Sequence, residues 1–157
     1  MRDRIRKRLE QGIMQFLRKN KLRYVVDEEG DFQVVMGFEE LPAQARILFL
    51  REGLFGEILT IVARFERLEE PLQEDAALKV ANQWNIERRW PRIYWREGQF
   101  YGDFHIDLES GFSQRFLELT LHRVIMGIIH FLLHVTKQED FIYREMQRRF
   151  FDNPRLN

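Results

Sequence analysis

The stretch Ala45–Glu66, ARILFLREGLFGEILTIVARFE, holds two runs rich in Ile, Leu, Phe and Val on either side of a short connection. The first run is Ala45–Arg51 and the second is Glu57–Glu66. β-Branched and aromatic residues favour strands, and the two glycines of the connection Glu52–Gly56 supply the backbone freedom of a turn. The stretch therefore predicts a pair of strands joined by a tight turn.

Two further strand pairs are predicted on either side of this one. Leu22–Asp27 and Asp31–Phe38 alternate apolar and polar residues, and Gly30 between them suits a turn position with positive φ. Ile93–Trp95 and Phe100–Leu108 form a similar pair. Each pair is expected to be a hairpin.

Three helices are predicted around these strands. Apolar residues at steps of three and four mark Arg2–Lys19 as an amphipathic helix. Pro71 suits the first position of a second helix that runs to about Asn85, and Ser113 suits the N-cap of a third that runs to about Lys137. The apolar positions expected on the second helix are Leu72, Ala76, Val80 and Trp84.

These elements predict one α+β domain over residues 1–157, with helices packed on a mostly antiparallel sheet in the order α-ββ-ββ-α-ββ-α. Its length suits a single domain, and no linker or internal repeat divides it. Residues 138–157, which include the amphipathic run Phe141–Phe151, are expected to form a helical tail.

Composition excludes several classes of protein. With 45% hydrophobic and 32% charged residues, the chain is too apolar for disorder and too charged for a membrane protein. The absence of cysteine excludes thiol catalysis, cysteine-ligated zinc and iron–sulfur clusters. Phosphate-binding glycine loops and nucleophile motifs are also missing, so we predict neither an enzyme nor a bound cofactor.

The distribution of charge and hydropathy indicates a cytoplasmic protein. Residues 1–23 are basic, but they include acids, lack Ser, and are not followed by the apolar region of a signal peptide. The longest uncharged stretch of the C-terminal half, Val124–Thr136, is shorter than the roughly 20 residues that cross a bilayer. We therefore expect no membrane span.

Three histidines lie on one face of the last predicted helix: His122, His130 and His134. The spacing of the last two can hold a metal ion, but Phe131 stands where a zincin motif has Glu. The interpretation we favour is a polar margin on a buried helix, without a metal.

Acidic residues and a histidine alternate along one strand face: Asp103, His105, Asp107 and Glu109. Such a row could bind a hard cation or supply acid–base catalysis, but neighbours on one strand project in parallel and do not converge. We expect a solvated face whose charge is balanced by Arg88, Arg89 or Arg92.

Basic residues crowd the first predicted helix: Arg2, Arg4, Arg6, Lys7 and Arg8. They could bind the phosphates of nucleic acid or an anionic membrane. Because they are spread around the helix without interleaved aromatic residues, we expect no nucleic-acid partner. An adaptor that binds an anionic surface through this helix remains the alternative function.

The last predicted helix is apolar on nearly every face, so it must be buried on nearly every face. A second copy of the chain could supply the cover, through residues such as Ile125, Ile129 and Leu132. The run Phe141–Phe151 of the same chain could supply it equally well.

One segment, Ala81–Tyr94 (ANQWNIERRWPRIY), resembles the signature of bacterial YbjN-domain proteins, in which an Asn-x-x-Asn helix end with a Trp leads into an extended segment. The acidic turn Asp107–Gly111 is also similar to that family. The resemblance implies a fold like that of type III secretion chaperones, which commonly dimerise and bind other chains without catalysis.

Two roles are open for the aromatic residues of this segment. Asn82 and Asn85 are expected to end the helix by bonding to its backbone, which makes the segment a structural corner. Alternatively, aromatic side chains form a groove for a peptide, and its residues are Trp84, Trp90, Tyr94 and Trp95. The leading hypothesis is a non-catalytic, chaperone-like or regulatory homodimer that binds a protein or peptide.

Overall fold

Strands β3 (Gln44–Glu52) and β4 (Ile58–Glu66) pair antiparallel over their full length. They form the centre of a six-stranded sheet in this computed structural model, which describes residues 2–69 and 72–138. Alternate side chains of both strands enter the core, and Ile47 and Phe49 of β3 are fully buried. The predicted central strand pair is thus confirmed.

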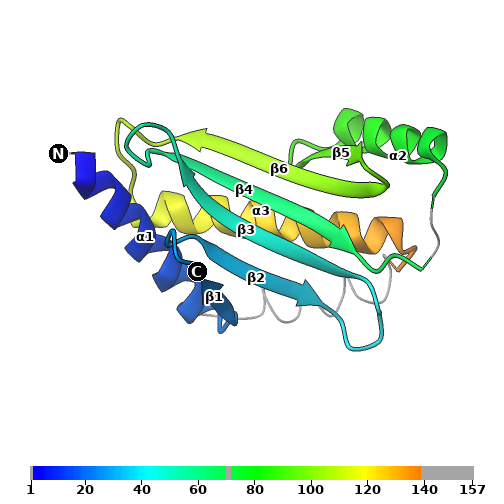
Figure 1. Cartoon of the computed structure of the whole chain (residues 1–157), viewed down its shortest axis with the longest axis horizontal. Helices are drawn as coiled ribbons and strands as arrows, with labels where there is room; N and C mark the ends of the chain where they lie inside the picture. The colour runs from blue at the N-terminus through cyan, green and yellow to red at the C-terminus, as the bar shows by residue number, and fades with distance from the viewer. Residues whose placement is uncertain (1, 70–71, 139–157) are drawn as a thin grey trace.

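The other strands extend the sheet on both sides (Figure 1). β1 (Tyr24–Val26) and β2 (Phe32–Gly37) lie beside β3, and β6 (Gln99–Asp107) and β5 (Arg92–Arg96) lie beside β4. The order is β1-β2-β3-β4-β6-β5, and every neighbouring pair is antiparallel. All three predicted hairpins are present. β1 begins two residues later than expected, because the Leu22 N–H bonds to the Leu17 carbonyl at the end of the first helix.

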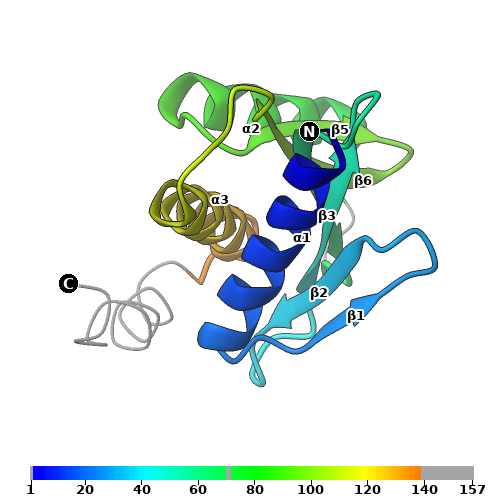
Figure 2. The same cartoon turned by 90° about the vertical axis from the view of Figure 1, so that its left-hand side faces the viewer.

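Two helices, α1 (Arg2–Lys19) and α3 (Gln114–Val135), pack on the same face of the sheet (Figure 2). The third, α2 (Glu74–Glu87), lies next to β5. Gly12 allows α1 and α3 to approach closely, since a Cβ there would lie 2.5 Å from a methyl carbon of Leu117. No described helix covers the opposite face of the sheet.

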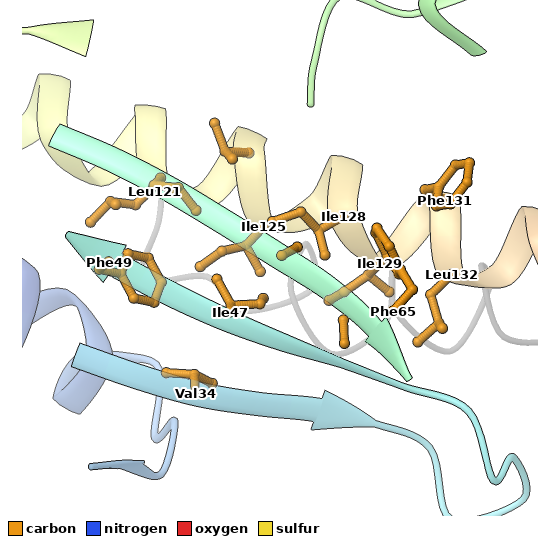
Figure 3. Close-up of a cluster of buried hydrophobic side chains, with 14 of the residues drawn as sticks. Val34, Ile47, Phe49, Phe65, Leu121, Ile125, Ile128, Ile129, Phe131 and Leu132 are labelled. Carbon is orange, nitrogen blue, oxygen red and sulfur yellow. The ribbon is translucent and has the colours of Figure 1, made fainter. Parts of the chain in front are cut away.

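The sheet buries the apolar surface of α3. Nine residues of α3 are buried, and Figure 3 shows several of them directed at β3 and β4. Ile125, Ile129 and Leu132 are only 2%, 2% and 0% exposed. Of the two expected sources of cover, a second copy of the chain is therefore not needed at these three residues, because they are already buried within one chain. The predicted helix Phe141–Phe151 lies outside the described residues.

The ends of α3 follow from its sequence. The Ser113 hydroxyl accepts the Phe116 N–H at 3.0 Å, which confirms the predicted N-cap. By its 22 residues and its composition the helix is apolar enough to cross a membrane, and half of its most apolar window is buried in the domain. A single helix of this kind is weak evidence for a membrane span, because the core helix of a soluble protein has the same properties.

The second helix differs from its prediction. It begins at Glu74, after Gln73 as N-cap, and the predicted first residue, Pro71, lies outside the described residues. Its buried residues are Ala77, Ala81 and Trp84. The buried positions were thus predicted one residue too early, at Ala76 and Val80 in place of Ala77 and Ala81, and Trp84 was placed correctly.

Candidate functional site

The described helices leave open the face of the sheet opposite α1 and α3, which we call the outer sheet face (Figure 2). Its centre carries an apolar strip of half-buried or exposed side chains. The strip consists of Val25, Val35, Leu48, Leu50, Ile58 and Val62.

Strand alternation explains why these side chains point away from the core. Leu48 lies between Ile47 and Phe49, which both face the helices, so its side chain lies on the other face. The register brings the strip together, because Leu48 is opposite Val62 on β4. Neighbouring apolar residues on paired strands form a continuous surface.

One end of the strip is bordered by the Glu66 cluster, formed by Gln44, Arg46, Arg64 and Glu66. The Glu66 carboxylate accepts hydrogen bonds from Arg46 Nε at 2.9 Å, from Gln44 Nε2 at 2.8 Å and from Arg64 Nε at 2.8 Å. Hydrogen bonding from Arg46 is the main cause that lowers the pKa of Glu66 to about 2. The carboxylate is therefore ionised throughout the physiological range.

On the β5 and β6 side lies the Asp103 network, formed by Glu52, Thr60, Arg92, Asp103 and His105. Arg92 donates two hydrogen bonds to Asp103, at 2.9 and 2.6 Å, and this hydrogen bonding, together with the charge of the carboxylate, raises the pKa of Arg92. The expectation that Arg92 balances this strand face is confirmed. Asp103 itself is buried and not solvated, because the guanidinium covers it.

The network contains a threonine, a histidine and an aspartate in sequence, the order of groups found in a hydrolytic triad. Thr60 Oγ1 is 2.9 Å from His105 Nδ1, and His105 Nε2 is 3.4 Å from Asp103 Oδ2. However, Thr60 is only 2% exposed and its hydroxyl also bonds to Glu52. A buried hydroxyl that is already shared with a carboxylate is poorly placed to attack a substrate, so the geometry favours a structural network.

Tyr94 is the predicted aromatic residue that lies on the outer sheet face. Its ring stacks on Tyr101 with centroids 5.6 Å apart, and Arg92 lies over it at 5.6 Å. Burial raises the pKa of Tyr94 above its ordinary value. Tyr94 therefore offers a rigid, partly exposed aromatic surface beside the Asp103 network.

Trp84 lies on the other side of the sheet, in the core. Its ring meets Phe131 edge-on at 5.1 Å and also contacts His130 and His134 of α3, at 5.5 and 6.0 Å. The indole Nε1 donates to the Pro91 carbonyl at 3.0 Å. This packing gives two of the three histidines a structural environment.

Trp90 and Trp95 are half-buried on the same side as Trp84. The bond between Trp90 and Pro91 is cis, and Gly127 of α3 makes room for it, since a Cβ there would lie 2.7 Å from the Trp90 carbonyl oxygen. Trp95 packs edge-on against Phe100 at 4.8 Å. The four predicted aromatic residues therefore occupy two faces of the sheet and do not line one groove.

Asn85 has a different role from the one expected. It does not end α2, which continues to Glu87 with the Arg88 N–H bonded to the Trp84 carbonyl. Its side chain instead donates to the Ile93 carbonyl at 2.8 Å and accepts the Ile93 N–H at 2.9 Å. Asn85 thus occupies the backbone N–H and C=O groups of Ile93, which point toward the free edge of β5.

Other predicted features lie apart from this surface. Burial, and then the charge of Arg123, lower the pKa of His122. Arg8 donates to the Phe112 carbonyl and lies 4.9 Å from the Phe112 ring, while Arg4, Arg6 and Lys7 are exposed. Within residues 2–69 and 72–138, no three His, Asp or Glu side chains are grouped to hold a metal ion.

The sequence of this chain is similar to that of a known protein family. The family model YbjN, described as "Putative bacterial sensory transduction regulator", matches residues 11–135. The chain belongs to the YbjN family. Among curated proteins, none matches this YbjN-family chain. The resemblance inferred from residues 81–94 is therefore confirmed by a match over most of the chain.

Two solved structures share the fold of this YbjN domain. One is the HopA1–SchA chaperone–effector complex, with a TM-score of 0.52, 15% identity, and coverage of 78% of this chain and 88% of the other. The second is the crystal structure of YbjN from E. coli, "a putative transcription regulator", with a TM-score of 0.50, 9% identity, and coverage of 80% and 86%. The chaperone-like α+β fold predicted from the sequence is confirmed.

Proposed function

We propose that this YbjN-family chain is a non-catalytic protein-interaction module, chaperone-like or regulatory, that binds a protein or peptide on its outer sheet face. The observation that carries the proposal is the apolar strip on a sheet face that no described helix covers. Apolar surface rimmed by polar groups is typical of protein-binding sites, and the Glu66 cluster and the Asp103 network form such a rim.

The family and the structural neighbours support this proposal. The family description names a regulator, and one neighbour is a chaperone in complex with an effector protein. We further propose that residues 1–157 form one domain with residues 138–157 as a helical tail, and that the chain acts as a homodimer in the bacterial cytoplasm.

Among the predicted aromatic residues, we place Tyr94 in the partner-binding surface. It lies on the outer sheet face, and its stacking on Tyr101 holds it in place without a partner. An aromatic side chain that is already ordered loses little conformational entropy on binding. Trp84 is excluded from this surface because it is 3% exposed.

The test is a binding measurement on surface variants. A protein recovered with the tagged wild-type chain from the source bacterium is purified, and its affinity is measured by calorimetry for wild type, Leu48→Glu and a matched control. Leu54→Glu is the control, since Leu54 is 90% exposed on the turn between β3 and β4, outside the apolar strip. We expect Leu48→Glu to weaken binding about tenfold or more and Leu54→Glu to leave it unchanged.

The same measurement separates the alternative function. If affinity falls steeply between about 50 and about 200 mM salt, and charge reversal at Arg4, Arg6 and Lys7 abolishes it, then α1 binds an anionic surface. A partner that binds Leu48→Glu as tightly as wild type contradicts the proposed surface.

A further inference from the structure

The two edges of the sheet differ in how they are protected. At the β5 edge, Asn85 holds both hydrogen-bonding groups of Ile93. At the β1 edge no described element lies beyond Tyr24–Val26, as Figure 2 shows. An unprotected strand edge is a template for pairing with another strand.

The register identifies which backbone groups of β1 are free to pair. The Asp27 N–H bonds to the Asp31 carbonyl at the hairpin end, and Val25 is opposite Gln33. In an antiparallel ladder, hydrogen-bonded and non-hydrogen-bonded residues alternate. Val25 and Asp27 therefore bond toward β2, and the N–H and C=O groups of Tyr24 and Val26 point away from the sheet.

The side chains of β1 are unusual for a free edge. Val25 is 65% exposed and Val26 is 46% exposed, and the strand contains neither Lys nor Pro, the residues that commonly block edges. Tyr24 holds the strand in place from the helix side, where its hydroxyl accepts a hydrogen bond from Arg18 and its ring packs on Phe32 at 5.7 Å.

The charged residues on either side of β1 indicate which strand could pair with this edge. Basic residues Lys21 and Arg23 precede β1, and acidic residues Asp27 and Glu29 follow it. A second copy aligned antiparallel with Val25 opposite Val25 places Arg23 opposite Asp27 on both sides of the twofold axis. The same alignment places Tyr24 opposite Val26, and these are the residues whose backbone groups are free.

We propose that two copies of this chain pair antiparallel through their β1 edges, centred on Val25, to form one continuous sheet. This inference rests on the homodimer in the proposed function and deepens it by naming the interface. Opposite charges directly across a strand pair stabilise it, whereas a parallel alignment would place like charges together.

Single cysteines test the alignment, since the chain has none of its own. Val25 would form a non-hydrogen-bonded pair with its counterpart, with Cα atoms about 4.5 Å apart, which suits a disulfide. We expect Val25→Cys to oxidise to a covalent dimer on the order of tenfold or more faster than Val35→Cys. Val35 is a matched control because it is 45% exposed on the same face but lies on β2, away from the edge.

A charge reversal tests the pairing of Arg23 with Asp27. Adding Arg23→Asp to Val25→Cys places two carboxylates opposite each other and should slow cross-linking several-fold. Lys79→Asp makes the same charge change on the exposed side of α2 and should not slow it.

Light scattering distinguishes a wrong interface from the absence of a homodimer. We expect the wild-type chain to scatter as a species of twice 19.2 kDa at tens of micromolar. A dimer in which Val25→Cys cross-links no faster than Val35→Cys overturns this interface and leaves the homodimer intact. A monomer at every concentration overturns both the interface and the homodimer, and leaves partner binding at the outer sheet face to its own test.

Discussion

The side-chain amide of Asn85 bonds to both backbone groups of Ile93, with its Nδ2 2.8 Å from the carbonyl oxygen and its Oδ1 2.9 Å from the amide nitrogen. This contact joins α2 to β5 as an added strand would. We predict that Asn85→Ala lowers the free energy of unfolding by about 1–3 kcal/mol, because two partly buried backbone groups lose their partners. Urea denaturation measures the change. Asn82→Ala, at an exposed position one turn earlier, should shift it by less than about 0.5 kcal/mol.

The second prediction concerns Gly127 of α3 and the stability of the folded chain. Alanine is the better helix former, so Gly127→Ala would stabilise an isolated helix. In this protein the new Cβ would lie 2.7 Å from the Trp90 carbonyl oxygen and 2.9 Å from Pro91 Cδ. We therefore expect a loss of about 1–3 kcal/mol in thermal or urea unfolding. A gain in stability would show that α3 and the Trp90–Pro91 segment separate easily, and Arg123→Ala on the exposed side of α3 serves as the reference.

The third prediction concerns Glu66 and the dependence of stability on pH. Its pKa is lowered from 4.5 to about 2 in the folded chain, so between these values the unfolded chain binds more protons. Its contribution is complete above about pH 5 and is lost as the pH falls toward 2. We expect Glu66→Gln to flatten the acid side of the stability profile by about 1–2 kcal/mol, after allowance for solvent screening. Equal slopes for Glu66→Gln and wild type would contradict the prediction.

The fourth prediction concerns Arg51, whose side chain stabilises the hairpin that carries the β1 edge. Its side chain is 2% exposed, and it bonds to Glu10 of α1 at 2.9 Å and to the Gly30 carbonyl at 2.7 Å. Arg51→Ala should cost about 3–5 kcal/mol, since Glu10 and the turn lose a buried partner. Glu10→Gln keeps the guanidinium and a hydrogen-bond acceptor, and should cost under about 1 kcal/mol. Hydrogen exchange at β1 and β2 should quicken in Arg51→Ala more than exchange at β6.

Hydrophobic periodicity predicted the six strands, α1 and α3 because each of these elements is governed by its own residues, whereas the apolar face of α2 was displaced by one position. The pairing of Arg92 with Asp103 was also accessible, since Arg92 directly precedes one strand of a predicted hairpin and Asp103 lies on the other. Whether Ile125 is covered by its own chain or by a second copy stayed open, because the width of the sheet beside α3 depends on how all six strands assemble.

The role of Asn85 was hidden for a similar reason. A local pattern marks Asn as a residue that ends helices, whereas its actual partner is the edge of a strand that follows a cis proline. Gly127 did carry a signal. A glycine in an otherwise apolar helix indicates close approach by another segment, which here is the Trp90–Pro91 backbone.

Asn85 also restricts where a second copy of this chain could add a strand. A sheet with two free edges could add subunits without limit, as fibrils do. Because Asn85 already occupies the outward groups of Ile93, another strand could not pair along the whole of β5, and in the proposed dimer the β1 edge is the one that is used. Loss of the Asn85 side chain would free the outward backbone groups of Ile93 for pairing. We expect this loss to favour polymers over the closed pair, so the Asn85 amide would limit aggregation.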